Sequence, residues 1–313
     1  MNRRELLTGA TALASYAALP EWFPHGAPGG GSGPNFSLPN DEILLVGDST
    51  TFSGLSVTKG PGYDPAIDVT NSFCIEFRNG HQNTLLNNTV IAQDQFDYND
   101  GTPTGIQADS IGCGLTFMRE YYVPNKLSAG RNVRITACGI GGTTISYWMA
   151  GGSQAPIVYT RINQSLAQNV GNVLVLVIIQ LGTNDAIAGV SQVTALANIE
   201  TLVTNYRNPS TITGATSSTP FLFTGLIPGW VASNPSTYGP VDAALKSIPA
   251  NISKTGYVDM ANLYGTGQPA TGQNGSGGVA YHPCAADERA YGGYVGGTYM
   301  NTGLPLAWAN LSP

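Results

Sequence analysis

The sequence predicts an α/β protein, a three-layer α/β/α sandwich built around a parallel sheet of about five strands. Five short apolar runs rich in β-branched residues have the length of strands, and segments with helical periodicity lie between them. Strands that alternate with helices indicate βαβ units, whose crossovers make neighbouring strands parallel. The five predicted strands are Ile43–Val46, Val133–Ala137, Val173–Ile179, Phe221–Leu226 and Tyr257–Met260.

The third run shows most clearly what kind of sheet to expect. Residues 173–179 read Val-Leu-Val-Leu-Val-Ile-Ile, apolar throughout rather than alternating. A strand with this pattern is typically buried on both faces, as in a parallel sheet covered by helices. Between the strands, helical spacing marks segments around residues 162–166 and 193–203, and residues 114–122 form a third predicted helix.

Residues 51–110 fit no simple βα unit. The segment is rich in loop-forming residues, and its only strand-like run is Ser72–Phe77. We therefore predict a single domain over residues 36–313 that carries a long loop-rich insertion at about 51–110. We expect this insertion to cover the edge of the sheet or the functional site.

The N-terminus resembles an export signal. Arg3 and Arg4 precede a short Ala-rich run, as in twin-arginine signals, and small residues follow at which cleavage after Ala14 or Ala17 is plausible. The following stretch, Gly26–Pro34, is a Gly/Pro-rich tether. The sequence thus predicts an export signal and tether over residues 1–35, and an exported protein. The alternative is an ordinary amphipathic N-terminal helix. No later segment is apolar for 18 residues, so no integral membrane segment is expected after signal removal.

Composition and the absence of known binding motifs indicate which partners and cofactors are not expected. Charged residues make up only 10% of the 313 residues, the formal net charge is −6, and no basic cluster occurs, so nucleic acid is not expected as a partner. The sequence contains no HExxH motif, phosphate loop or EF-hand loop, and its four cysteines lack zinc-ligand spacing. Neither a metal nor a cofactor is therefore predicted. Cys74, Cys113, Cys138 and Cys284 can form two disulfides or remain as buried thiols.

Reactive side chains follow the first three predicted strands. The connections read Gly47–Thr50 (Gly-Asp-Ser-Thr), Gly139–Thr143 (Gly-Ile-Gly-Gly-Thr) and Gly182–Asp185 (Gly-Thr-Asn-Asp). In open parallel sheets, ligands bind beyond the carboxyl ends of the strands, so these three connections are expected to meet at one site.

The chemistry of acyl transfer fits these residues. A serine hydroxyl needs a neighbouring base, and the developing oxyanion needs hydrogen-bond donors. We predict that Ser49 is the nucleophile, and that its own N–H, the Gly142 N–H and the Asn184 side-chain amide form the oxyanion hole. The chain has three histidines: His25 lies in the tether and His81 in a polar turn. The predicted catalytic base is therefore His282, which we place in a late loop.

Taken in order, Gly-Asp-Ser, the second-block glycine, Gly-x-Asn-Asp and a C-terminal histidine resemble the SGNH (GDSL-type) hydrolase superfamily over roughly Ile43 to Tyr291. Within this span, Gly141–Trp148 resembles the Gly-Gly-Thr-x-Ile-x-x-Trp signature of sialate O-acetylesterase-like carbohydrate esterases, as does the preceding Gly114–Glu120. The resemblance implies a flavodoxin-like α/β/α fold. It also implies Ser49 as nucleophile, Gly142 and Asn184 as oxyanion donors, and His282 as base.

The sequence departs from the family pattern at two places. The superfamily usually has an aspartate three residues before the histidine, where this chain has Val279. The carbohydrate-esterase branch usually has Gly-Gln-Ser in its first block, where this chain has Gly-Asp-Ser. With Val279 in the acid position, we predict a Ser–His dyad. The alternative acids are Asp287, Glu288 and Asp259.

These residues predict a serine esterase that removes small acyl groups, chiefly O-acetyl, from an acylated carbohydrate through an acyl-enzyme. One alternative is a lipase or thioesterase that uses the same site. The other is a catalytically idle glycan-binding module, which the missing acid favours. Trp148 and Trp230 are candidates to stack on a sugar ring, although core packing is the commoner role of such residues.

Overall fold

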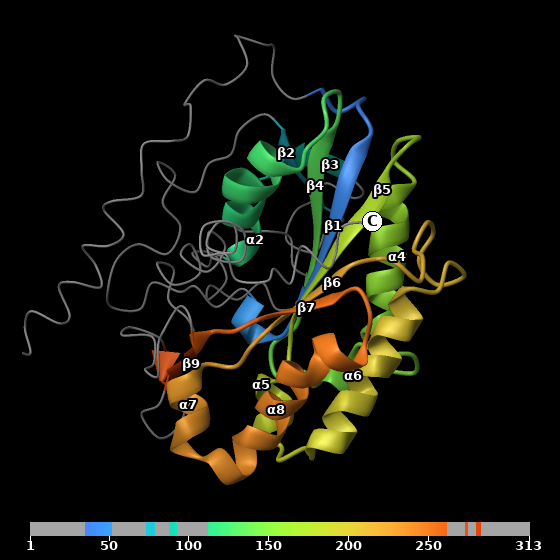
Figure 1. Ribbon diagram of the computed structural model, residues 1–313. Helices are drawn as coiled ribbons and strands as arrows, with labels where there is room; N and C mark the ends of the chain where they lie inside the picture. The colour runs from blue at the N-terminus through green and yellow to red at the C-terminus, as the bar shows by residue number, and fades with distance from the viewer. Residues whose placement is uncertain are drawn as a thin grey trace, which may run out of the picture. The chain divides into compact units, whose positions relative to one another are not determined.

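A seven-stranded sheet forms the centre of the fold in the computed structural model, which describes residues 35–51, 73–78, 88–92, 112–261, 273–274 and 280–282 (Figure 1). The strand order is β3-β2-β4-β1-β5-β6-β7. Six strands run parallel, and β3 pairs with β2 in the antiparallel direction. The strands are β1 (Asn40–Gly47), β2 (Cys74–Arg78), β3 (Asn88–Ile91), β4 (Asn132–Gly139), β5 (Val173–Gln180), β6 (Phe221–Thr224) and β7 (Thr255–Val258).

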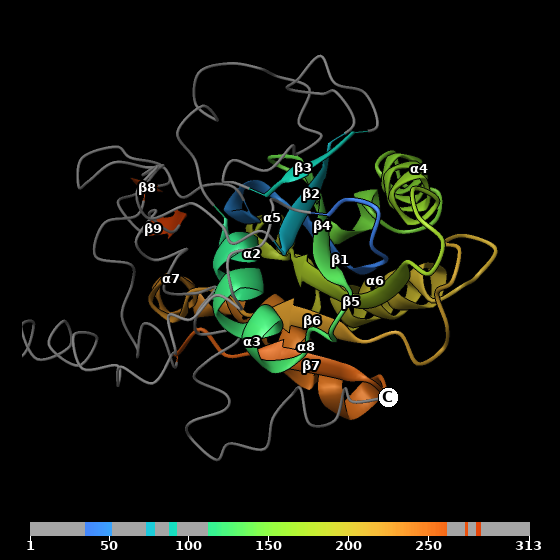
Figure 2. The same ribbon diagram turned by 90° about the horizontal axis from the view of Figure 1, so that it is seen from above.

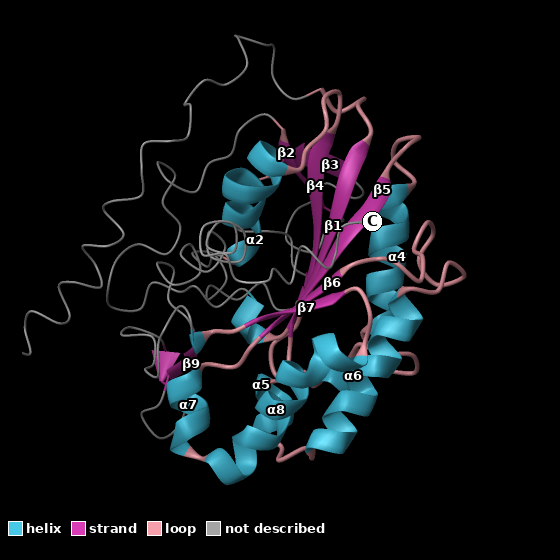
Figure 3. Ribbon diagram, viewed as in Figure 1, coloured by secondary structure: helices cyan, strands magenta, loops and turns pink. Residues whose placement is uncertain are grey.

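Helices cover both faces of this sheet, so the predicted three-layer sandwich is confirmed (Figures 2 and 3). One face packs against α2 (Cys113–Thr116), which continues as the π-helical η2 (Phe117–Tyr122) and α3 (Val123–Asn125). The other face packs against α4 (Ala155–Leu166), α6 (Gln192–Tyr206) and α8 (Pro235–Asn251). Side chains of β1 alternate between the two cores: Ile43 and Leu45 face α2, whereas Leu44 and Val46 face the other layer.

The sheet is larger than the predicted five strands because the segment at 51–110 contributes β2 and β3. The strand-like run at residues 72–77 is β2, which pairs in parallel with β4, and β3 then closes that edge. The remainder of the insertion lies outside the described residues. Several strand boundaries also differ: β1 begins at Asn40, three residues earlier than predicted, β6 ends at Thr224 before Gly225, and β7 begins at Thr255, two residues earlier than predicted.

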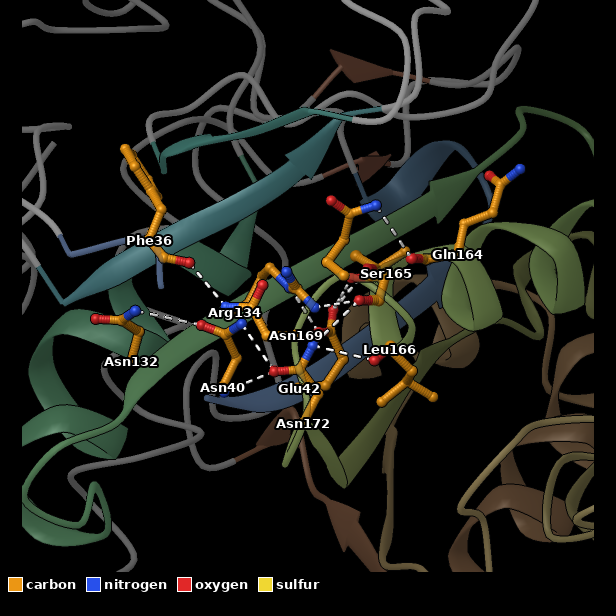
Figure 4. Close-up of polar contacts among 12 residues, drawn as sticks. Phe36, Asn40, Glu42, Asn132, Arg134, Gln164, Ser165, Leu166, Asn169 and Asn172 are labelled. Atoms are coloured by element: carbon orange, nitrogen blue, oxygen red, sulfur yellow. Dashed lines mark hydrogen bonds and ion pairs between the residues drawn. The ribbon is translucent and has the colours of Figure 1, made fainter. Parts of the chain in front are cut away.

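A buried ion pair joins β1 and β4 to α4 (Figure 4). Arg134 Nε donates to Glu42 Oε2 at 2.7 Å, and the two side chains are 1% and 0% exposed. The second carboxylate oxygen of Glu42 accepts from Thr136 Oγ1 at 2.6 Å and from Ser165 Oγ at 2.9 Å. Arg134 also donates to the carbonyl of Ser165. Because each buried charge has several partners, the network fixes the end of α4 against the sheet.

Among the described residues, no helix is long and apolar enough to cross a bilayer. Two short helices complete the carboxyl side of the sheet, α5 (Thr183–Ile187) after β5 and α7 (Pro228–Ser233) after β6. Together with the 3-10 turn η1 (Ser49–Thr51), they lie where the predicted site was expected (Figure 1).

Candidate functional site

Three neighbouring strands end at the same level, and each is followed by a predicted site residue. Gly47 of β1 is in register with Gly139 of β4 and with Gln180 of β5. Ser49, Gly142 and Asn184 follow these three residues within two to four positions. The sheet therefore brings Ser49, Gly142 and Asn184 together at the carboxyl ends of its strands, where open parallel sheets bind ligands.

The turn after β1 is tightly built around Ser49, which is half-buried at the start of η1. The buried carboxylate of Asp48 accepts from the Thr50 backbone N–H at 2.9 Å and from Thr50 Oγ1 at 2.8 Å. Gly47 has no room for a side chain, because a Cβ there would lie 1.6 Å from Thr51 Oγ1 and 2.7 Å from the Gln180 carbonyl oxygen. The glycine of the Gly-Asp-Ser motif thus allows the turn to fold back against the strand ends.

The loop after β4 places Gly142 in a left-handed conformation, with φ +76°. A Cβ at this position would meet nothing within 4 Å, so glycine is required here by the backbone angle rather than by space. Thr143 fixes the loop from within: its Oγ1 donates to the Ile140 carbonyl at 2.8 Å and accepts from Trp148 Nε1 at 2.9 Å. The Thr and Trp of the Gly-Gly-Thr signature are therefore a structural pair.

Asn184 joins the turn after β1 to the loop after β4. Its Nδ2 donates to Asp48 Oδ2 at 3.1 Å and to the Thr143 carbonyl oxygen at 3.1 Å. A side-chain amide has only two N–H donors, and both have acceptors here. The geometry fixes Asn184 between the Ser49 turn and the Gly142 loop. Donation to an oxyanion would therefore require one of these hydrogen bonds to be shared or exchanged.

Asp185, which was not predicted as a site residue, also holds the loop that contains Gly142. Its Oδ2 accepts from the Ile145 backbone N–H at 2.9 Å, and the residue is 1% exposed. Burial raises the pKa of Asp185 to about 6, although the backbone hydrogen bond from Ile145 opposes the shift. Burial also raises the pKa of Asp48 to about 6; hydrogen bonds from Thr50 lower it, and the nearby Asp185 charge adds to the rise. The two carboxyls are thus poorly solvated neighbours.

A pocket opens next to the Ser49 turn on the side of β5 and β6. It is adjacent to the site because Thr50 follows Ser49 and Thr183 precedes Asn184. Five of the ten lining residues have aliphatic or aromatic side chains and four have polar ones, and each of these nine is at most 7% exposed. The lining residues are Thr50, Gln180, Leu181, Thr183, Thr224, Gly225, Leu226, Ile227, Trp230 and Met260.

The predicted base lies in a strand rather than in a loop, so that part of the prediction is wrong. His282 ends the short strand β9 (Ala280–His282), which pairs in the antiparallel direction with β8 (Gln273–Asn274). Cα atoms of β9 lie within 8 Å of Cα atoms of η1, so the strand that carries His282 runs beside the turn that carries Ser49.

The Ser–His dyad stays a prediction. Asp287 and Glu288 lie outside the described residues. Asp259 follows β7, and its Oδ1 accepts from the Ala261 backbone N–H at 2.9 Å. Within the described ranges, no group of three or more His, Cys, Asp or Glu residues is arranged to hold a metal ion.

Other candidate residues have structural positions. Trp148 is fully buried, and Trp230 is 3% exposed and stacks on Tyr238 with ring centroids 4.0 Å apart, so neither presents an open face to a sugar. Cys74, Cys113 and Cys138 are buried and form no disulfide within the part of the chain that the structure describes, while Cys284 lies outside the described residues. Sequence reasoning missed Gln180, which contacts the Ser49 turn through Asp48 and Thr50.

No protein-family model and no curated protein matches this sequence, whereas solved structures match it in fold. NanS matches with a TM-score of 0.62 at 14% identity, over 82% of this chain and 94% of that chain. A protein from Arabidopsis thaliana matches with a TM-score of 0.59 at 17% identity, over 84% and 99% of the two chains. A carbohydrate acetylesterase from Xanthomonas citri has a TM-score of 0.50 at 14% identity, and covers 80% of this chain and 54% of that one. The chain therefore has the predicted SGNH-type fold.

Proposed function

We propose that this protein is a serine esterase that removes small acyl groups, chiefly acetyl, from a carbohydrate through an acyl-enzyme. The observation that carries the proposal is the common register of Gly47, Gly139 and Gln180, which brings Ser49, Gly142 and Asn184 to one edge. The strand with His282 lies beside the Ser49 turn, which supports its role as base. The fold shared with a carbohydrate acetylesterase supports the substrate class.

In the proposed reaction, Ser49 Oγ attacks the ester carbonyl carbon while His282 takes the hydroxyl proton. The carbonyl oxygen becomes an oxyanion that accepts hydrogen bonds from the backbone N–H groups of Ser49 and Gly142 and from Asn184 Nδ2. Collapse of this intermediate expels the sugar alkoxide, which receives the proton from His282. Water, deprotonated by His282, then attacks the acyl-enzyme and releases the acid and free Ser49.

Asn184 contributes to the oxyanion hole by sharing one of its amide hydrogens. Both of its amide hydrogens have acceptors, Asp48 Oδ2 and the Thr143 carbonyl oxygen. A full negative charge on the substrate oxygen is a stronger acceptor than a neutral carbonyl. The hydrogen directed at Thr143 is therefore shared with the oxyanion, while the bond to Asp48 keeps the amide in place.

The pocket beside Thr50 is evidence that the acyl group of the substrate is small. Once Ser49 and the oxyanion donors hold two substituents of the tetrahedral carbon, the acyl chain and the sugar oxygen remain. A sugar is large and polar, whereas half of the residues that line the pocket are buried and apolar, Leu226, Ile227 and Trp230 among them. The acyl group therefore occupies the pocket, and the carbohydrate extends outward from the strand ends.

The experiment compares wild type and Ser49→Ala on p-nitrophenyl acetate, a long-chain p-nitrophenyl ester and an acetylated polysaccharide. We expect wild type to release acetate from the polysaccharide, to prefer the short ester, and to lose both activities with Ser49→Ala. Preference for the long-chain ester would favour a lipase or thioesterase. Glycan binding without hydrolysis would favour a catalytically idle module.

The proposed substrate is an extracellular or periplasmic one. The paired arginines and Ala-rich run at the N-terminus support export by a twin-arginine route. A surface with few charged residues is consistent with that location.

A further inference from the structure

Gln180, the last residue of β5, contacts the nucleophile turn on both sides of Ser49. Its backbone carbonyl accepts from the Asp48 N–H at 3.1 Å, and its side-chain Nε2 donates to the Thr50 carbonyl oxygen at 3.2 Å. The residue is only 4% exposed, so water does not readily replace the side-chain bond.

The orientation of this amide is defined by a second partner in the opposite layer of the fold. The Sγ of Cys113, at the start of α2, donates to Gln180 Oε1 at 3.7 Å. A thiol donor requires the oxygen of the amide, and the Thr50 carbonyl requires its nitrogen. A flipped amide would lose both bonds, so Cys113 and Thr50 together select one orientation.

We propose that Gln180 is a positioning residue that holds Ser49 in the geometry needed for attack, with Cys113 as its support. This inference rests on the proposed esterase function. Asn184 lies four residues after Gln180. The connection that leaves β5 therefore carries both the residue that positions the Ser49 turn and the predicted oxyanion donor. Loss of the Nε2 bond frees the Thr50 carbonyl and lets the turn move relative to Asn184. A misplacement of about 1 Å can reduce the rate by about 10²-fold.

The first test is Gln180→Met, which keeps an unbranched side chain of similar length and removes both side-chain hydrogen bonds. With p-nitrophenyl acetate, we expect kcat to fall by about 10- to 100-fold and KM to change by less than about 2-fold. The rate at which a fluorophosphonate labels Ser49 is expected to fall by the same factor. Both rates are measured at a temperature where the variant is fully folded by circular dichroism.

A matched pair of cysteine variants tests the proposal without changing Gln180. Cys113→Ala removes the thiol donor, whereas Cys74→Ala removes a buried thiol from β2 that belongs to the same hydrophobic core. We expect Cys113→Ala to slow Ser49 labelling by about 3- to 10-fold and Cys74→Ala to leave it unchanged. This pair decides the question if Gln180→Met does not fold.

The outcomes separate this inference from the proposed function. Wild-type labelling and kcat in Gln180→Met, or equal effects of the two cysteine variants, would overturn the role of Gln180 while leaving the esterase intact. A wild-type protein that neither hydrolyses esters nor reacts with the fluorophosphonate would overturn both.

Discussion

Asn184 uses both amide hydrogens to join the Ser49 turn to the Gly142 loop, so its removal is expected to affect catalysis directly. Asn184→Ala should lower kcat by roughly 10²–10³, the scale of losing one oxyanion donor. KM should change little, because the bond to substrate strengthens mainly in the transition state. Steady-state kinetics with p-nitrophenyl acetate measure both values.

Asn163→Ala is the matched control for that experiment. Asn163 Nδ2 donates to the Thr211 carbonyl oxygen at 2.9 Å, the same kind of bond in a part of the fold that lies away from the strand ends. We expect this variant to keep the wild-type kcat. An Asn184→Ala variant that changes KM alone would assign Asn184 to substrate binding instead.

The raised pKa of Asp185 predicts how stability depends on pH. Burial raises this pKa from 3.8 to about 6, so between about pH 4 and pH 6 the native state holds a proton that the unfolded state has released. The free energy of unfolding therefore loses a contribution from Asp185 as the pH rises through this window. Asp185→Asn keeps an oxygen that can accept from the Ile145 N–H but cannot ionise.

The free energy of unfolding of Asp185→Asn minus that of wild type should become more positive between pH 4 and pH 7. Removal of the Asp185 charge also lowers the pKa of Asp48, which changes the difference in the same direction. Urea denaturation at several pH values measures it. A difference that stays constant, or that falls as the pH rises, would show that Asp185 is not destabilised in its charged form.

At the same scale, the site residues predicted from the sequence are those with a local pattern. Ser49, Gly142 and Asn184 stand in short motifs directly after apolar runs, and parallel topology alone brings strand ends together. Gln180 lies outside these motifs, and Asp185 stands beside Asn184 in the Gly-Thr-Asn-Asp motif, but neither partner is visible there, because Gln180 contacts Thr50 and Asp185 contacts Ile145, 130 and 40 positions away. Only the folded arrangement identifies them.

Among the elements, the pocket between β5, β6 and α7 gives a prediction about acyl selectivity. Ile227 lines the pocket, so Ile227→Ala should enlarge it and raise the ratio of kcat/KM for p-nitrophenyl butyrate to that for the acetate. A gain of about 10-fold or more is expected, since one methylene group in a fitted pocket is worth about that factor. The ratio is independent of the amount of active protein.

Ile199→Ala serves as the control, because Ile199 is buried in the same core cluster but does not line the pocket. Both variants lose the same number of methyl and methylene groups. A ratio that rises equally in both variants would mean that general loosening of the core, rather than the pocket, sets acyl preference.

Helix α8 and strand β3 show where sequence patterns were insufficient. Val241, Ala244, Leu245 and Ile248 of α8 have clear helical spacing, but Pro240 and Pro249 lie inside the helix and indicate turns when read locally. Burial of the apolar face overcomes that preference. By contrast, β3 has only four residues, and its place depends on pairing with β2. The long apolar runs were correctly predicted, because strands buried on both faces leave an unambiguous signal.

For the whole molecule, the export proposal is tested by replacing Arg3 and Arg4 together with Lys. In a host with a twin-arginine system, we expect the variant to remain in the cytoplasm while wild type is exported, because the receptor recognises the arginine pair. Cell fractionation followed by immunoblotting measures this. Export of the variant at the wild-type level would indicate the general secretory route or the absence of an export signal.

The central claim is that the strand ends of this fold build a serine nucleophile at Ser49. The most direct measurement is fluorophosphonate labelling of the folded protein, followed by mapping of the modified residue by mass spectrometry. The account predicts a single adduct on Ser49, formed with time-dependent loss of p-nitrophenyl acetate hydrolysis and absent from Ser49→Ala. An adduct on another serine, or undiminished hydrolysis by Ser49→Ala, would contradict it.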